Sequence, residues 1–223
     1  MCAVFTTFAP RMERNKRKTE TPAQYRENLK EKIVKVAMRE FKSKGVRNVK
    51  MDDIATALSI SKRTLYEVYP NKEELLLEGI RLDEENRVVL MKDYVAQNNP
   101  TVMDVILKFY HTQMEAFSQI NPVFFSDLHK YERVRNYMQE LRVVRQQNTL
   151  AFFKRGVEDG YFREDVDYAI ISQMGSATME YVMDEQMYKQ YDLKYIFRNI
   201  VLVFLRGFCT PKGLSVIDEK LNE

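Results

Sequence analysis

The chain has 223 residues, of which 45% are apolar and 30% charged, and its formal net charge is +3. This is the composition of a globular protein with a sizeable core. Glycine and proline, with 7 and 6 residues, are too scarce for a collagen-like or turn-rich β fold and favour long helices. The longest purely apolar run, residues 200–205, is far shorter than the roughly 20 residues of a membrane span, so we expect no membrane partner.

The small net charge hides an uneven distribution along the chain. Residues 1–72 contain 17 Lys and Arg against 8 Asp and Glu, whereas the remaining residues contain 18 against 24, which together give the totals of 35 and 32. A basic N-terminal third on an acidic remainder is typical of a nucleic-acid-binding segment joined to a body with another task. A basic surface also suits an anionic membrane, so charge alone leaves both partners open.

The residues that usually carry catalysis or hold metals are few and scattered. His111 and His129 are the two histidines, and neither belongs to a recognised metal-binding motif. Cys2 and Cys209 lie at opposite ends of the chain. A phosphate-binding glycine loop and the usual metal, redox and nucleophile motifs are absent from the sequence. We therefore predict a protein that is not an enzyme, needs no cofactor and no metal, and is cytoplasmic.

Residues 1–22 carry no helical period and contain a cluster of basic residues between Arg11 and Lys18. Such a segment is typical of a terminal arm that is disordered when unbound. We predict that residues 1–22 form a disordered basic arm that contacts phosphate or enters a minor groove.

A helical period begins at about residue 24. Residues 24–44 place apolar side chains at three- and four-residue steps, which predicts an amphipathic helix that ends before Gly45. Residues 51–58 and 61–69 predict two further short helices, and the hydroxyl of Ser61 can cap the second by accepting from a backbone amide.

The two short helices have the spacing of a helix-turn-helix. Ile54, Ala55 and Leu58 form the buried face of the first helix, residues 59–61 form a tight connection, and Leu65 is the buried residue of the second. In this geometry the second helix lies in a major groove with its N-terminal residues at base edges. An ordinary hairpin of two helices has similar spacing and is the alternative interpretation.

The rest of the chain predicts further helices and no strand pair. Asn71 and the pairs Asn99-Pro100 and Asn121-Pro122 supply a cap, followed in the two pairs by a first-turn proline. We predict an all-α protein of about nine helices, with a three-helix helix-turn-helix domain at 23–71 and a larger helical effector-binding and dimerisation domain at 72–223. The helices expected in the larger domain span about 72–97, 100–119, 122–130, 132–159, 165–188 and 193–208.

Residues 33–77 resemble the TetR family of bacterial transcriptional regulators. The apolar positions of the first helix and the sequence blocks around the turn carry the resemblance, which covers about a fifth of the chain. These are Ile33, Ala37, Phe41 and Gly45, then Met51-Asp-Asp-Ile-Ala55, Ser61-Lys-Arg-Thr-Leu-Tyr66 and Tyr69-Pro-Asn-Lys-Glu-Glu-Leu75.

Four positions depart from the family's common pattern. Ser59 stands where the turn usually has glycine, and Arg63 replaces a frequent glycine at the DNA-facing start of the second helix. Val68 replaces a frequent aromatic residue, which removes a hydroxyl contact to phosphate. Lys50 occupies the usual Ser or Thr cap position and offers a cation near phosphate instead.

Residue types assign roles on DNA within this arrangement. Arg63 can form a bidentate pair with guanine, worth about 1–3 kcal/mol of discrimination, and Thr64 can contact a base edge or a thymine methyl. Tyr66 can bond phosphate or stack along a sugar. Three lysines suit phosphate contacts, which position the protein without selecting sequence, or are solvated surface charges: Lys50, Lys62 and Lys72.

The resemblance implies a homodimer formed by the last two long helices. A dimer would place two recognition helices about 34 Å apart, one turn of DNA. The helix at 193–208 is apolar around most of its circumference, so burial at the centre of the monomer is the alternative. The residues expected at the interface are Ile171, Met174 and Thr178 on one helix and Ile200, Val203 and Phe204 on the other.

The resemblance also implies a small-molecule effector, whose identity the sequence does not give. The middle helices are rich in Phe, Tyr and Met, which at helical spacing indicates core more often than a pocket. His111 is the expected polar anchor of an otherwise apolar site. The residues expected to line it are Phe109, His111, Met114, Phe117, Phe125, Tyr137, Phe153 and Met174.

These observations predict a ligand-responsive regulator that binds a double-stranded DNA operator. We expect a repressor, released when a small apolar or amphipathic effector binds better to a state whose recognition helices are wrongly spaced. The alternative is a helical module that binds a small molecule or a partner and has no DNA function. That alternative leaves the basic N-terminal third unexplained.

Overall fold

The computed structural model describes residues 21–221, apart from the side chains at 146 and 147. Within these residues the chain forms ten α-helices and one 3-10 turn, and no strand. The predicted basic arm falls almost entirely on residues 1–20 and so lies outside the described residues. The elements are α1 (Pro22–Lys44), α2 (Met51–Ala57), α3 (Lys62–Val68), α4 (Lys72–Asn98), α5 (Val102–Gln119), α6 (Pro122–Leu128), α7 (Glu132–Glu158), α8 (Tyr168–Asp184), η1 (Met187–Lys189), α9 (Leu193–Phe208) and α10 (Pro211–Lys220).

Two N-terminal helices begin at the caps expected from the sequence. The Ser61 hydroxyl accepts a hydrogen bond from the Thr64 amide at 3.0 Å, and Asn71 Oδ1 accepts from the Glu74 amide at 2.9 Å. Each bond satisfies one of the amides that the first turn of a helix leaves without an internal partner. Both predicted caps are therefore confirmed.

The start of α5 differs from the prediction. Asn99 does not cap this helix but follows α4 in the left-handed conformation, with φ 42°. Thr101 is the cap: its hydroxyl accepts from the Asp104 amide at 3.2 Å, and the Asp104 carboxylate accepts from the Thr101 amide at 3.0 Å. This capping box satisfies two amides reciprocally, which a lone asparagine side chain cannot do.

The helix expected at 165–188 is shorter in the structure, where α8 covers Tyr168–Asp184. The Asp167 carboxylate sets its start by accepting hydrogen bonds from the amides of Ala169 and Ile170, at 2.9 and 3.2 Å. Gln186, with φ 53°, lies outside the helical conformation and separates α8 from η1.

A tenth helix, α10, follows the last helix expected from the sequence. Its first turn contains Gly213, a residue type that disfavours helix. The structure requires that glycine, because an added Cβ would lie 2.5 Å from the Tyr161 carbonyl oxygen. Close packing against the segment after α7 therefore explains a residue that intrinsic helix propensity disfavours.

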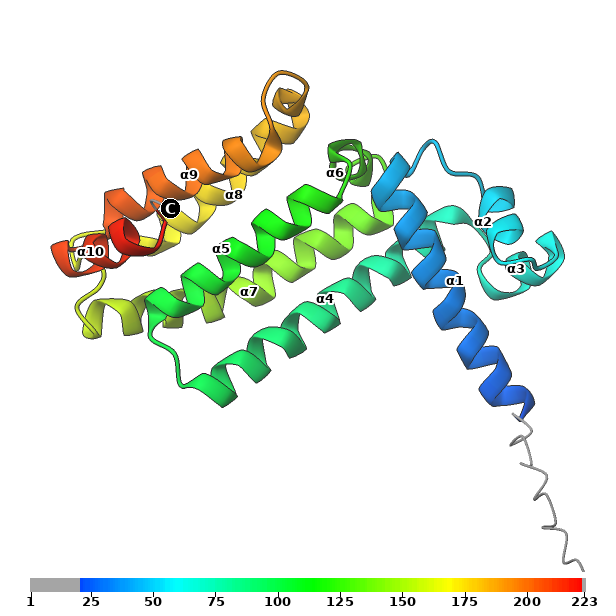
Figure 1. Cartoon of the computed structure of the whole chain (residues 1–223), viewed down its shortest axis with the longest axis horizontal. Helices are drawn as coiled ribbons and strands as arrows, with labels where there is room; N and C mark the ends of the chain where they lie inside the picture. Colours follow the sequence, from blue (N-terminus) through cyan, green and yellow to red (C-terminus); the bar gives the residue numbers. More distant parts are fainter. Residues whose placement is uncertain (1–20, 222–223) are drawn as a thin grey trace, which may run out of the picture.

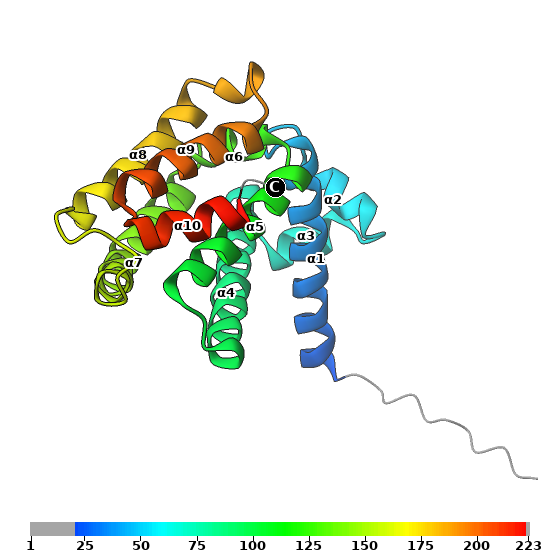
Figure 2. The same ribbon diagram turned by 60° about the vertical axis from the view of Figure 1, so that its left-hand side comes forward.

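The helices form a small N-terminal unit and a larger layered body (Figure 1). α2 and α3 lie beyond α1 at one end, while α4, α5 and α7 run side by side. Figures 1 and 2 both show α8 and α9 packed together on the side of the body that faces away from α2 and α3. No helix among residues 21–221 combines the length and apolarity that crossing a membrane requires.

One core joins the N-terminal unit to the body. Phe41, Ile54 and Leu65 are fully buried, and the same cluster includes Phe124 of α6 and Val134 of α7. The apolar interior therefore continues across the boundary predicted at residues 71 and 72. A shift of α6 or the start of α7 consequently has to be accommodated by the helices that carry α3.

A second, aromatic core holds the far end of the body together. Phe162 and Phe208 are nearly fully buried, with ring centroids 5.3 Å apart. Phe153 stacks on Tyr168 at 4.5 Å between centroids and also packs against Phe162 and Phe208. This cluster fixes α7, α8 and α9 relative to one another.

Candidate nucleic-acid interface

α2 and α3 pack through small and branched side chains across the four residues 58–61. Ile54, Ala55 and Leu65 are each at most 2% exposed. Within the turn, Ser59 has φ 54°, and the Ile60 amide donates to the Ala55 carbonyl at 3.0 Å. Serine thus adopts the left-handed conformation that glycine usually supplies, at a cost of about 1 kcal/mol.

The opposite side of α3 faces solvent. The Arg63 side chain is 89% exposed and the Tyr66 residue 47% exposed, whereas Leu65 between them is fully buried. Thr64 is half-buried, and its hydroxyl lies 2.8 Å from that of Ser61. Four of the six side chains predicted to contact DNA therefore lie on one short helix whose other side is anchored in the core.

Both cations at the start of α3 are held by neighbouring carboxylates. Lys62 Nζ lies 2.6 Å from the Asp52 carboxylate on α2, and Arg63 Nε lies 2.8 Å from the Glu67 carboxylate one turn along α3. Hydrogen bonding to these carboxylates raises the pKa of Lys62 and of Arg63, so both stay charged. These exposed pairs are weak enough for an incoming anion to exchange with the carboxylates.

The two other predicted phosphate contacts differ in environment. Lys50 is exposed, and its backbone amide donates to the Asp53 carboxylate at 2.8 Å, which supports the first turn of α2. The Lys72 ammonium donates to the carbonyls of Val46 and Val49, both at 2.9 Å, and burial lowers its pKa. Lys72 therefore ties α4 to the loop before α2, and its phosphate contact stays a prediction.

A buried carboxylate of the body holds that same loop. Asp127 of α6 is 1% exposed. One of its oxygens accepts from the Arg47 amide at 3.0 Å and the other from Lys130 Nζ at 3.0 Å. The chain between α1 and α2 is thus fixed by a charge-assisted bond from the body.

The end of α1 is fastened to the start of α6 as well. The Asn121 amide donates to the Lys42 carbonyl at 2.7 Å, and its side chain donates to the Ser43 carbonyl at 3.3 Å. Gly45, with φ 83°, leaves so little space that an added Cβ would lie 2.9 Å from a Val123 methyl carbon. α6 therefore reaches the N-terminal unit through backbone hydrogen bonds as well as apolar packing.

The sequence analysis did not identify Asp127. The signal available was a single carboxylate within the apolar stretch of residues 123–128, whose helical period would turn it inward. A buried carboxylate needs a partner, but spacing along the chain does not say which element supplies it.

The residues predicted for a dimer interface divide into exposed and half-buried groups. Met174 and Val203 are 51% and 71% exposed. Ile171, Ile200 and Phe204 pack partly against the cores of their own chain, and Thr178 is half-buried. α8 and α9 expose further large apolar side chains, namely Ile170 and Tyr181 on α8 and Tyr195 on α9.

The structure separates the residues predicted to line an effector site. Phe117 contacts Phe125 edge to face at 5.6 Å between centroids, and Met114 is partly buried in the aromatic core. Tyr137 packs against the N-terminal core instead, and Phe153 belongs to the aromatic core. Three others are exposed: Phe109, His111 and Met174. Phe109 and Phe117 both contact Phe197, at 6.5 and 5.2 Å between centroids, so part of the set lies close together. The contact of these eight residues with an effector stays a prediction.

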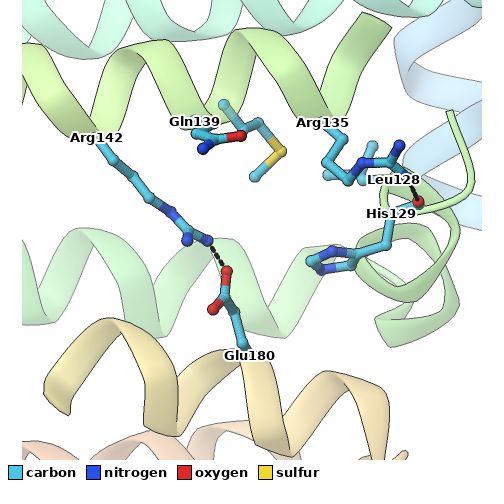
Figure 3. Close-up of a pocket in the computed structure, with 7 residues that line it drawn as sticks. Leu128, His129, Arg135, Gln139, Arg142 and Glu180 are labelled. Carbon is cyan, nitrogen blue, oxygen red and sulfur yellow. Dashed lines mark hydrogen bonds and ion pairs between the residues drawn. The ribbon is translucent and has the colours of Figure 1, made fainter. Parts of the chain in front are cut away.

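A cavity of about 310 Å³ lies elsewhere, between the end of α6, α7 and α8. Figure 3 shows Arg142 of α7 reaching Glu180 of α8, the Arg135 side chain of α7 turned toward the backbone at the end of α6, and the His129 ring extending between them. None of the eight predicted residues lines it. The cavity is therefore polar and charged, where the sequence had indicated an aromatic site.

Residues 33–78 match a family model described as bacterial regulatory proteins, tetR family. The matched segment runs from α1 into α4 and includes both short helices of the turn. No curated protein matches the sequence at a significant level.

Solved structures resemble the whole fold at low sequence identity. A protein from Saccharomonospora viridis, crystallised in complex with choline, has a TM-score of 0.67 at 16% identity, over 82% of this chain and 99% of that chain. The regulatory protein TetR from Rhodobacter sphaeroides has a TM-score of 0.65 at 15% identity, over 80% and 97%. The ketosteroid transcriptional regulator KstR2 of Mycobacterium tuberculosis has 0.56 at 19%, over 82% and 95%. The arrangement of helices is thus shared well beyond residues 33–78.

Proposed function

Because residues 33–78 carry the N-terminal domain of the tetR family of bacterial regulatory proteins, and because the chain has the fold of TetR-family transcriptional regulators, we propose that this protein binds operator DNA. The observation that carries the proposal is the outward face of α3, where Lys62, Arg63 and Tyr66 project from a helix anchored by Leu65. An α-helix of this kind fits the major groove. The protein acts through binding and not as an enzyme.

Each side chain has a distinct task on the duplex. Arg63 exchanges the Glu67 carboxylate for the O6 and N7 acceptors of a guanine, and Thr64 contacts the neighbouring base. Lys62 leaves Asp52 for a phosphate, and Lys50 binds a phosphate beside α2. The phosphate contacts supply salt-dependent affinity, while Arg63 supplies most of the sequence preference.

The protein acts on DNA as a homodimer joined through α8 and α9. Ile170, Met174 and Tyr181 on α8 and Tyr195 and Val203 on α9 are each at least half exposed, which is unusual for large apolar side chains on one surface. A two-fold pairing of this surface buries them and presents two α3 helices to successive turns of DNA.

A small ligand regulates this binding. α6 contacts the loop between α1 and α2 through Asp127 and Asn121, and the cavity touches α6 at Leu128 and His129. A ligand that favours one position of α6 therefore biases the orientation of α3 by its differential affinity for the two states. We expect a cytoplasmic repressor that an apolar or amphipathic effector releases from its operator.

Selection from random duplex DNA tests the proposal. The purified full chain, at about 0.15 M salt, should enrich a palindromic sequence with half-sites one helical turn apart. Binding to that sequence should reach a Kd of about 10⁻⁸ M or below and weaken as salt rises. Absence of any enriched sequence would favour the alternative, a helical small-molecule or partner-binding module without DNA function.

A further inference from the structure

The cavity between α6, α7 and α8 carries more positive than negative charge. Two guanidinium groups line the cavity, and one of them, that of Arg142, is neutralised by an ion pair with Glu180 (Figure 3). The other belongs to Arg135, which donates to the His129 carbonyl at 3.1 Å. Among residues 21–221, no carboxylate forms an ion pair with Arg135. One cation therefore faces this space without a neutralising partner.

The remaining lining is suited to an amphipathic molecule. Leu128 and Met138 supply apolar surface, and Leu128 is itself buried in the N-terminal core. Gln139 offers an amide that can donate to an oxygen. At about 30 Å³ for each non-hydrogen atom, the share of a water molecule in the liquid, the cavity of about 310 Å³ holds about ten such atoms.

We propose that this cavity binds a small carboxylate with a short apolar chain, whose carboxylate pairs with Arg135. A single negative charge balances the single excess cation, whereas a phosphate dianion would leave an excess of negative charge. Guanidinium groups match carboxylates in geometry, since two parallel N–H donors can meet the two oxygens. The inference rests on the proposed function, because it names the chemical class of the effector.

Binding at this position reaches the N-terminal unit through one helix end. Leu128 and His129 line the cavity, and the preceding residue, Asp127, holds the Arg47 amide. A carboxylate that draws Arg135 away from the His129 carbonyl changes the hydrogen bonding at the end of α6. The same helix end thus serves both the ligand and the loop before α2.

Calorimetric titration of the full chain with octanoate, octan-1-ol and octylamine tests the proposal. These probes share a chain length and differ in the charge of the head group. Octanoate should bind at least about tenfold more tightly than the other two, because a charge-assisted hydrogen bond is lost without the carboxylate. Equal affinity for the three probes, stronger binding of octylamine or the absence of octanoate binding would overturn the proposal.

Substitutions locate the binding. Arg135→Gln should weaken octanoate about tenfold, whereas Lys154→Gln, which removes a cation from an exposed part of the same helix, should leave it unchanged. Glu180→Gln should tighten octanoate about threefold, because it frees Arg142 and removes a repelling carboxylate. A misfolded variant cannot gain affinity, so tighter binding by Glu180→Gln cannot come from a folding defect. Unchanged or weaker octanoate binding by a Glu180→Gln protein that unfolds as cooperatively as the wild type would contradict the proposal.

Duplex binding without ligand separates the two levels of inference. If the protein enriches a palindromic sequence but does not bind octanoate, only the proposed carboxylate site is refuted. If octanoate binds in a manner that depends on Arg135 but the protein enriches no sequence, only the proposed DNA function is refuted. In the expected case octanoate lowers operator affinity of the wild type and not of Arg135→Gln.

Discussion

Two surfaces of this protein are strongly exposed, and they differ in chemistry. The outer side of α3 presents Lys62 and Arg63, each already paired with a carboxylate. The outer side of α8 and α9 presents Met174 and Val203, which are 51% and 71% exposed. Exposed cations are well solvated by water and can exchange their carboxylate partners for another anion. Exposed apolar side chains are stabilised only when another surface covers them.

The two surfaces also depend on their supports differently. Leu65 is the buried residue that anchors α3, and the loop before α2 is held by Asp127 from the body. α8 and α9 instead rest on the broad aromatic core around Phe162 and Phe208. The α3 surface is therefore in contact with α6 through one loop, while the α8–α9 surface rests on the aromatic core.

The largest expected effect comes from charging the α8–α9 surface. Val203→Arg should prevent dimer formation and weaken operator binding about 1,000-fold, because a paired surface would bury two guanidinium groups without partners. Sedimentation at micromolar concentration and fluorescence anisotropy with operator DNA measure both effects. Val144→Arg on α7, at a valine that is 66% exposed, is the matched control and should change neither. A dimeric Val203→Arg protein would contradict the assignment of this surface.

Removing the buried carboxylate tests how the body supports α3. Asp127→Ala should lower the free energy of unfolding by about 3 kcal/mol, because it leaves the Arg47 amide and the Lys130 ammonium without their acceptor. Urea denaturation measures the loss. The exposed Asp93 of α4 provides the control, and Asp93→Ala should have almost no effect. A loss below about 1 kcal/mol would mean that the N-terminal unit holds its loop by itself.

Arg63→Ala should remove sequence preference from the α3 surface. We expect about 2 kcal/mol, or roughly 30-fold, weaker binding to the selected operator and little change on random duplex, because a guanine contact is lost while phosphate contacts remain. Lys92→Ala removes an exposed cation of α4 and should leave both affinities unchanged. Equal weakening on both duplexes would show that Arg63 contacts phosphate instead.

Alkaline pH should destabilise both cores, and the pH at which the loss of stability begins should differ between them. Burial raises the pKa of the Cys209 thiol to about 11 and that of the Tyr69 phenol to about 12. The unfolded chain loses these protons at lower pH than the folded chain, so stability falls as pH rises through 9 for Cys209 and through 10 for Tyr69. Each group should account for about 2 kcal/mol.

Denaturation at a series of pH values distinguishes the two groups. Cys209→Ala should flatten the decline that begins at pH 9, and Tyr69→Phe should flatten only the decline above pH 10. Identical curves for wild type and Cys209→Ala would show that the thiol titrates alike in both states.

The smallest effect concerns the strained turn before α3. Ser59→Gly should stabilise the protein by about 0.5–1 kcal/mol, since glycine adopts φ 54° without steric cost and this gain exceeds the entropy lost by the chain. Ser59→Ala keeps the Cβ and should not stabilise. Thermal unfolding measures both, and a destabilised Ser59→Gly variant would indicate that the serine hydroxyl matters more than the strain.

The all-helical class and the turn between α2 and α3 follow from local patterns in the amino-acid sequence. The apolar positions Ile54, Ala55 and Leu65 and the cap Ser61 lie within twelve residues, and each acts on its immediate neighbours. Local signals of this kind need no knowledge of distant elements, because helical period and capping depend on residues three or four positions away.

Which elements contact one another became clear from the packing of the helices and not from local patterns. An inward-facing Phe153 gives the same helical period whether it lines a cavity or fills a core, and the packing places it on Tyr168. Asp127 finds the Arg47 amide 80 residues away, and Arg142 meets Glu180 across α7 and α8. Such contacts depend on how whole helices pack, because the partner of a buried or charged group is set by proximity in space and not by spacing along the chain.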